Sequence, residues 1–176
     1  AKKSITGANL SADEFTFTLK GNGQNQSKKN AADGTVTFDK LTYDQTDIGK
    51  SYTYTIEEVD SGKAGYTYDK AIYEVNVDIS DAGAGKLKVD KTIKKKVDST
   101  ETDVAEITFA NAYAATGELL LTAKKSMAGA SLGADQFTFT LKGNGQNQSK
   151  KNAADGTITF DKLTYDQNDI GKSYTY

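Results

Sequence analysis

The first 54 residues of the chain return, nearly unchanged, from residue 123 onward. Ala1 aligns with Ala123 and Tyr54 with Tyr176, so the period is 123 − 1 = 122 residues. Seven of the 54 aligned positions differ, and every difference is mild. A period of this size is that of one ordinary domain, so it predicts an array of domains and not a solenoid of small repeats.

The repeat divides the chain into three expected parts. Residues 1–114 form a complete repeat, residues 115–122 form a short junction, and residues 123–176 form the N-terminal part of a second repeat. We therefore expect these 176 residues to be a window on a longer array. Near-identical copies in series suit a spacer or stalk, which gains length with each copy, better than a turnover enzyme.

Apolar and polar residues alternate along several short segments, as they do in half-buried strands. Turn sequences such as Asp33-Gly34 separate these segments, and the polar segment 21–34 is expected to be an exposed hairpin connection. This pattern predicts an all-β, immunoglobulin-like β-sandwich. The alternating apolar positions are Phe15, Phe17, Leu19, Val36, Phe38, Tyr52, Tyr54, Ile56, Tyr73, Val75, Val77, Ile79, Leu87, Val89, Ile107 and Phe109.

Composition excludes several functions. All basic residues are lysines and the formal net charge is −2, which argues against a nucleic-acid partner. No run of 18 apolar residues occurs, so membrane insertion of this segment is not expected. Cys and His are absent, which removes thiolate chemistry, the commonest general base and the commonest transition-metal ligand. We expect neither a metal nor a cofactor.

Three polar residues stand where the alternation requires apolar ones. The alternation of residues 52–56 continues to Glu58, that of residues 107–109 continues to Asn111, and that of the first strand turns Lys3 inward. Burying such groups costs several kcal/mol unless they satisfy one another. An ordinary buried hydrogen-bond network, or strand ends open to water, would also explain them, because all three residues lie near strand ends. A slip of one residue would instead turn Lys2 and Glu57 inward.

A buried Lys, Glu and Asn also have a specific chemistry available to them. Desolvation lowers the pKa of a lysine and raises that of a glutamic acid, so the neutral forms of both become accessible. A neutral amine can attack the side-chain carbonyl carbon of asparagine while a carboxylic acid relays the proton. Ammonia leaves and a Lys–Asn isopeptide bond remains. The reaction occurs only once in each molecule. We therefore expect a single-turnover self-crosslinking reaction and not an enzyme.

The chain resembles the isopeptide-forming pilin and adhesin domains of Gram-positive surface proteins, of the streptococcal pilin linker and Cna B-type group. The residues that carry the resemblance are "KSITGANLSADEFTFTL" at 3–19, "GTVTFDKLTYDQTDIGKSYTYTIEEV" at 34–59, "GYTYDKAIYEVNVDI" at 65–79 and "FANAY" at 109–113. By position, the resemblance implies that Lys3 is the reactive lysine, Glu58 the catalytic acid and Asn111 the acceptor. Lys125 is then the nucleophile of the second repeat, without its Glu and Asn in these residues.

Together these features predict a structural stalk or fibre domain of a bacterial adhesin or pilus, extracellular and anchored to the cell wall through other regions. Its expected partners are neighbouring copies of the same repeat. An adhesive module that binds a host glycan or matrix protein is the alternative. A turnover enzyme would need a deep pocket with two facing carboxylates. The near-identical copies would also permit a swap in which residues 123–176 replace residues 1–54 against residues 55–113, although the connection is short for that crossing.

Overall fold

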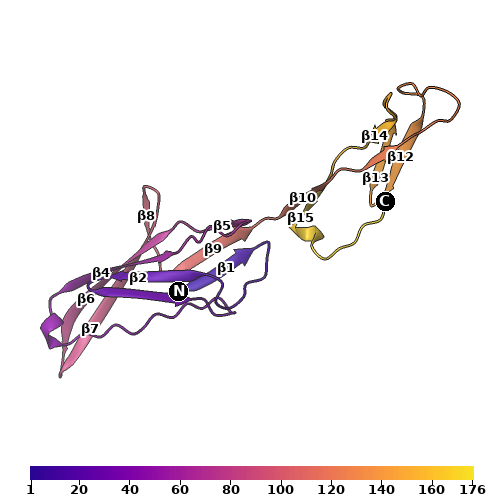
Figure 1. The fold of residues 1–176 in the computed structure, drawn as a ribbon. Coiled ribbons are helices and arrows are strands. Elements are labelled where there is room, and N and C mark those ends of the chain that lie inside the picture. Colours follow the sequence, from indigo (N-terminus) through magenta and orange to yellow (C-terminus); the bar gives the residue numbers. More distant parts are fainter. The chain divides into compact units, whose positions relative to one another are not determined.

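The computed structural model describes all residues 1–176, which form two compact units, Ala1–Tyr113 and Ala114–Tyr176. Strands make up nearly all of the regular structure, with two short 3-10 turns, η1 (Gln45–Asp47) and η2 (Gln167–Asp169). Figure 1 shows the strands of both units. The prediction of an all-β fold is confirmed. The structure has no helix that is long and apolar enough to cross a membrane.

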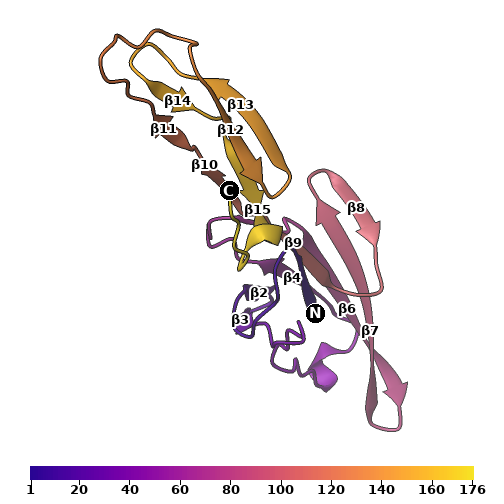
Figure 2. The ribbon, with the colours of Figure 1, turned by 90° about the vertical axis from the view of Figure 1, so that its right-hand side faces the viewer.

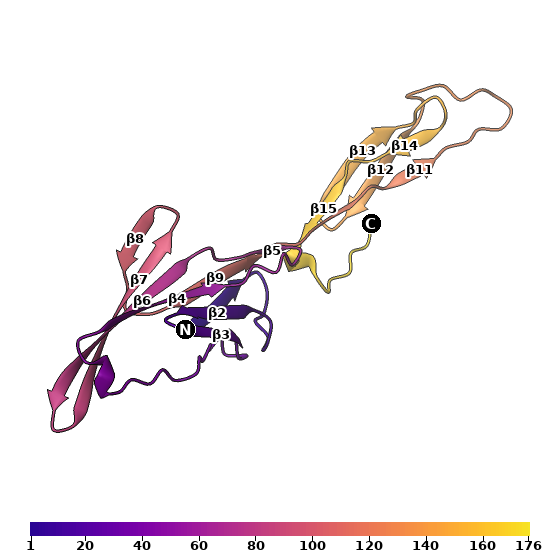
Figure 3. The same cartoon turned by 60° about the vertical axis from the view of Figure 1, so that its left-hand side comes forward.

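The larger sheet of the first unit has six strands in the order β3-β2-β4-β6-β7-β8, and each neighbouring pair is antiparallel. The long β6–β7 hairpin and the shorter β8 are seen side by side in Figure 3. The strands of this sheet are β2 (Thr16–Gly21), β3 (Gln24–Lys29), β4 (Ser51–Glu58), β6 (Ile72–Gly83), β7 (Lys86–Val97) and β8 (Thr100–Asp103).

The smaller sheet of the first unit has three strands in the order β1-β9-β5. The first strand, β1 (Lys2–Thr6), lies parallel to the last, β9 (Thr108–Tyr113), and β5 (Tyr66–Thr67) completes the sheet on the other edge of β9. Residues from the two ends of the unit are therefore direct neighbours in one sheet.

The core lies between these two sheets. Phe17 of β2 and Tyr73 of β6 both contact Phe109 of β9, with ring centroids 5.1 and 5.0 Å apart, and all three are fully buried. The first unit is thus a β-sandwich, as the alternation predicts. The other buried apolar residues of this core are Phe15, Leu19, Val36, Tyr54, Ile56, Tyr68, Ala71, Val77, Ile79 and Ile93.

The expectation that residues 21–34 form only a connection is wrong, because β3 lies within them. β3 has the sequence QNQSKK and no apolar residue, so hydrophobic alternation cannot indicate it. It is an edge strand, and β2 is the only strand with which it pairs. The turn before it is Asn22-Gly23, in which both φ angles are positive (48° and 78°), as a two-residue hairpin turn requires.

The second unit consists of paired strands (Figure 2). Its β12–β13 hairpin has the register of β2–β3, with Thr138 opposite Lys151 as Thr16 is opposite Lys29. Its small core contains Leu141, Ile158, Phe160 and Leu163. The strands are β10 (Thr116–Leu119) with β15 (Leu163–Asp166), β11 (Thr122–Lys124) with β14 (Thr157–Thr159), and β12 (Thr138–Gly143) with β13 (Gln146–Lys151).

Candidate functional site

Three polar side chains meet inside the first unit. Lys3 Nζ donates to Glu58 Oε2 over 2.8 Å, and Asn111 Nδ2 donates to Glu58 Oε1, also over 2.8 Å. The carboxylate of Glu58 therefore lies between the amine and the amide, with one oxygen directed to each. The structure brings together all three residues that the sequence predicts for the site.

The strand pairing explains why these side chains converge. In the parallel β1–β9 pair, Lys3 is opposite Phe109 and Ile5 is opposite Asn111. Lys3 and Asn111 are therefore offset by two residues along the pair and lie on the same face of the smaller sheet. Glu58 is the last residue of β4 in the larger sheet, where it pairs with Phe17. Its side chain spans the space between the sheets.

The site is closed to water. The side chains of Lys3 and Glu58 are 0% exposed, and Asn111 is 2% exposed. The ring of Phe15 lies 4.7 Å from Lys3 Nζ. Burial lowers the pKa of Lys3, although the contact with Glu58 opposes this change, and burial raises the pKa of Glu58 against the contact with Lys3. Both changes favour transfer of a proton from the amine to the carboxylate.

The alternative register is not the one that the structure adopts. Lys2 points outward, where its Nζ donates to Thr35 Oγ1 over 2.8 Å. Glu57 faces outward as well and forms an ion pair of 3.0 Å with Lys20. Lys2 and Glu57 thus lie on the solvent-exposed faces of their sheets. This is expected, because each is next in sequence to a residue, Lys3 or Glu58, that points inward.

A glycine turn holds β1 against the rest of the unit. Lys3 N donates to the carbonyl oxygen of Gly34 over 2.7 Å, and a Cβ on Gly34 would lie only 2.1 Å from the Lys3 carbonyl oxygen. The φ angle of Gly34 is +81°, a conformation that other residues rarely adopt. Glycine thus allows the close approach that places the Lys3 backbone.

Sequence reasoning did not find Asp69, which lies between β5 and β6. Its backbone N–H donates to Asn111 Oδ1 over 2.8 Å. Its carboxylate accepts from the backbone N–H groups of Ala71 and Ala110, each over 2.9 Å. Asp69 lies outside the alternating segments and contacts Asn111 through its main chain, so no residue pattern could have indicated it.

Lys125 of the second unit has part of the surroundings of Lys3. Its Nζ lies 4.8 Å from the ring of Phe137, and its backbone N–H donates to Gly156 over 2.8 Å. Phe137 is nevertheless 37% exposed, whereas its counterpart Phe15 is 2% exposed. Residues 123–176 thus reproduce the part of the site that comes from residues 1–54, which is the lysine with its neighbouring ring.

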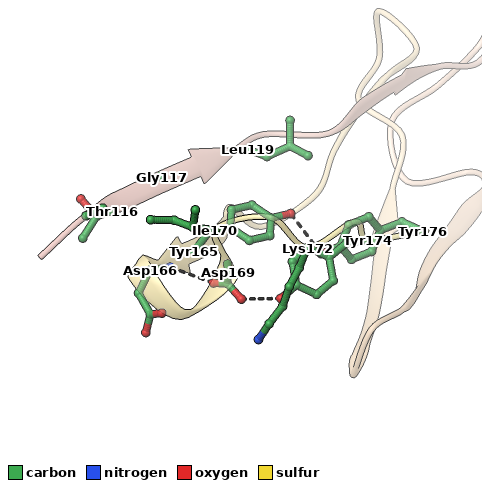
Figure 4. A pocket seen from close by; sticks show the side chains of 11 residues that line it. Thr116, Gly117, Leu119, Tyr165, Asp166, Asp169, Ile170, Lys172, Tyr174 and Tyr176 are labelled. Atoms are coloured by element: carbon green, nitrogen blue, oxygen red, sulfur yellow. Dashed lines mark hydrogen bonds between the residues drawn. The ribbon is translucent and has the colours of Figure 1, made fainter. Parts of the chain in front are cut away.

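A cleft of about 500 Å³ in the second unit is lined by tyrosines and two carboxylates (Figure 4). The carboxylates belong to the cap of η2: Asp166 accepts from the N–H of Asn168 over 2.7 Å, and Asp169 accepts from the N–H of Asp166 over 2.8 Å and from the hydroxyl of Tyr174. The Tyr174 hydroxyl lowers the pKa of Asp169. Both carboxylates thus stabilise this turn.

Comparison with known proteins places the chain in a family. Residues 1–114 and again residues 121–176 match the family described as FctA, Spy0128-like isopeptide containing domain. No curated protein matches the chain. Among solved structures, the chain is similar to the T-13 major pilin of Streptococcus pyogenes, with 17% identity, a TM-score of 0.44, and 93% of this chain and 74% of that chain covered.

It is also similar to another major pilin structure from Streptococcus pyogenes, with 14% identity, a TM-score of 0.41, and 94% of this chain and 71% of that chain covered. The family match extends over almost the whole sequence, including the segments that hold Lys3, Glu58 and Asn111. The chain belongs to the FctA family of Spy0128-like isopeptide-containing domains.

Proposed function

We propose that the chain is part of a bacterial surface fibre of the pilus type, and that its complete repeat is locked by a self-made isopeptide bond between Lys3 and Asn111. Membership of the family supports the structural role. The observation that carries the bond is the position of Glu58, which contacts the nucleophile through one oxygen and the leaving group through the other.

The reaction begins with transfer of a proton from Lys3 Nζ to Glu58, which leaves a neutral amine and a neutral carboxylic acid. The amine nitrogen attacks Asn111 Cγ, and the carbonyl electrons move to Oδ1. Once the acid proton lies on Oε1, Glu58 gives it to Nδ2 and takes a second proton from Nζ on Oε2. The Cγ–Nδ2 bond then breaks, ammonia leaves, and an amide joins Lys3 to Asn111 while Glu58 stays protonated.

The burial of the site supports each of these steps. In water the amine would remain protonated, whereas the apolar walls lower its pKa. Burial also raises the pKa of Glu58 and so favours its protonated form, which is neutral and needs no counter-charge after the bond has formed. The carboxyl group therefore fits the site both before and after the reaction.

The bond would close a loop of 111 − 3 = 108 residues and restrict the unfolded chain by about 4–5 kcal/mol. Tension that enters at β1 and leaves at β9 would pass through this covalent link, and the chain between them would stay folded. A chain without cysteine gains in this way a crosslink that reducing agents do not break. We place the protein on the cell surface, where neighbouring copies of the repeat are its partners.

The adhesive alternative has no comparable support. The aromatic side chains of the first unit are buried or packed against its core, except Tyr113, whose ring lies 4.8 Å from that of Tyr66. The exposed large apolar residues of this unit are all aliphatic: Ile48, Val59, Ile72, Val89 and Val97. An aromatic patch of the kind that binds glycans or matrix proteins is not formed there.

The test is the intact mass of residues 1–176 beside the Lys3→Ala, Glu58→Ala and Asn111→Ala variants. We expect the unsubstituted chain to be one ammonia lighter than its sequence and the three variants to have full mass. Lys2→Ala and Glu57→Ala are matched controls, because they remove the outward-facing neighbours, and both should lose ammonia. An unsubstituted chain at full mass would show that the bond does not form.

A further inference from the structure

We propose that the backbone N–H of Asp69 is the oxyanion donor of this reaction, and that the Asp69 carboxylate positions it. The inference rests on the proposed Lys3–Asn111 bond and adds a group that contacts the reacting amide directly. It concerns the side of Asn111 that faces away from Glu58.

The hydrogen bonds fix the orientation of the Asn111 amide. A backbone N–H can only donate, so the atom 2.8 Å from Asp69 N is the oxygen Oδ1. The Glu58 oxygen 2.8 Å away on the other side contacts the amide nitrogen Nδ2. The leaving group thus faces the proton relay, and the carbonyl oxygen faces a main-chain donor.

Attack on Cγ converts the carbonyl into an alkoxide, and the negative charge develops on Oδ1. A donor that stabilises such a charge must lie about 2.7–3.1 Å from the oxygen. Asp69 N satisfies this requirement before the reaction starts. Because Asn111 is almost fully buried, water cannot take the place of that donor.

The carboxylate of Asp69 holds this peptide group in place. One oxygen accepts from Ala71 N, and the other accepts from Ala110 N, the residue before Asn111 on β9. The connection between β5 and β6 is thereby tied to the strand that carries the acceptor. The donor and the amide accordingly keep their distance without a rearrangement during the reaction. The negative charge of Asp69 also contributes, after burial, to the raised pKa of Glu58.

The test replaces single amides by esters in the full chain. An α-hydroxy acid with the side chain of aspartate at position 69 removes the N–H and keeps the carboxylate. The matched control is the same replacement at Lys70, whose side chain points to Asp60 at the surface. Protein is made by cell-free synthesis and quenched in denaturant at intervals, and the fraction that has lost ammonia is read from the intact mass.

We expect the ester at position 69 to slow ammonia loss by about 10²-fold or more, the effect of removing one oxyanion donor. The ester at position 70 should react at the rate of the unsubstituted chain. Asp69→Ala, which keeps the N–H but loses both carboxylate contacts, should react at an intermediate rate. Circular dichroism of the slow variants, purified before they react, should show the native fold, which separates slow chemistry from misfolding.

An ester at position 69 that folds and reacts at the unsubstituted rate would overturn the inference and leave the bond itself intact. A fully folded unsubstituted chain that never loses ammonia would instead refute the proposed bond. The two failures are therefore distinguished within the same experiment.

Discussion

Lys3 lies opposite Phe109 in the parallel β1–β9 pair, two residues before the position where Ile5 lies opposite Asn111. Side chains two residues apart share one face of a sheet, so this register puts Lys3 and Asn111 on the inner face as diagonal neighbours. A third side chain, Glu58, reaches them from the opposite sheet. The two sheets thus supply different parts of the site, and the site exists only when they have packed.

The Glu58→Gln substitution tests the proton relay with almost no change of volume. Glutamine cannot exchange protons between the amine and the amide, so we expect a folded chain at full mass. Its free energy of unfolding should be lower by about 4–5 kcal/mol, since the 108-residue loop (111 − 3) stays open. Intact mass and denaturant unfolding measure the two effects.

The control for this substitution is Glu57→Gln. Glu57 forms its ion pair with Lys20 on the exposed face, and such pairs contribute less than about 1 kcal/mol. This variant should lose ammonia normally. If Glu57→Gln stopped the reaction and Glu58→Gln did not, the relay would be assigned to the wrong carboxylate.

Gly34→Ala should impair both folding and crosslinking. A Cβ at this position would lie 2.1 Å from the carbonyl oxygen of Lys3, so β1 must move away from its place. Gly49 is a matched control, because its φ angle is also positive (+78°) but nothing lies within 4 Å of its added Cβ. Gly49→Ala should cost about 1–2 kcal/mol and leave the reaction intact.

The rate of ammonia loss in the two glycine variants decides whether contact or backbone strain matters. Equal rates would mean that the approach of Gly34 to Lys3 does not position the nucleophile. A lower rate for Gly34→Ala alone is the expected result.

Lys125→Ala should leave the loss of one ammonia from residues 1–176 unchanged. Lys125 lies in the second unit, whereas Glu58 already contacts both Lys3 and Asn111 within the first. We expect the chain to lose one ammonia and a peptide map to join residue 3 to residue 111. A crosslinked peptide that contains Lys125 would instead reveal the swap of residues 123–176 for residues 1–54.

The rate of crosslinking should fall both in acid and in alkali. The reaction needs one proton shared by the Lys3–Glu58 pair, and the ion pair and the neutral pair contain the same number of protons. The rate is therefore flat between the two pKa values of the pair. It falls in acid, when both groups are protonated, and in alkali, when neither is.

The direction of each pKa change indicates where the acid and alkaline limbs of the pH–rate profile lie, that is, the pH ranges in which the rate falls. Burial raises the pKa of Glu58 above its ordinary 4.5, so the acid limb lies above that pH, and burial lowers the pKa of Lys3 below 10.5, so the alkaline limb lies below that pH. Quenched cell-free synthesis over a series of buffers measures the profile. A rate that rises steadily with pH would indicate that only the deprotonation of Lys3 matters.

Simple alternation predicted much of the fold and the place of the three side chains. A strand turns every second residue to the same face, so apolar neighbours show that Lys3, Glu58 and Asn111 point inward. The structure has them in contact. Their roles in a reaction stay predictions.

Two features could not be predicted in this way. β3 is polar throughout and is held by main-chain hydrogen bonds to β2, so side-chain character does not mark it. Asp69 reaches Asn111 through its N–H, a group that every residue except proline has. The type of a residue therefore says least about the contacts that its main chain makes.

Burial itself is not a property of local sequence. Phe15 and Phe137 have nearly the same neighbours along the chain, yet one is 2% and the other 37% exposed. Tyr66 and Tyr68, which belong to residues 55–113, pack against Phe15 with ring centroids 5.7 and 5.9 Å away. Long-range packing therefore decides whether the apolar face of a strand is buried.

The parallel pairing of β1 with β9 has a mechanical meaning of its own. When the N-terminal end of β1 and the C-terminal end of β9 are pulled apart, parallel strands must slide along each other, because the two ends lie at opposite ends of the pair. All hydrogen bonds of the pair then bear the load at once in shear, whereas an antiparallel hairpin opens them one at a time like a zip. The first unit resists stretching through the topology of this strand pair alone.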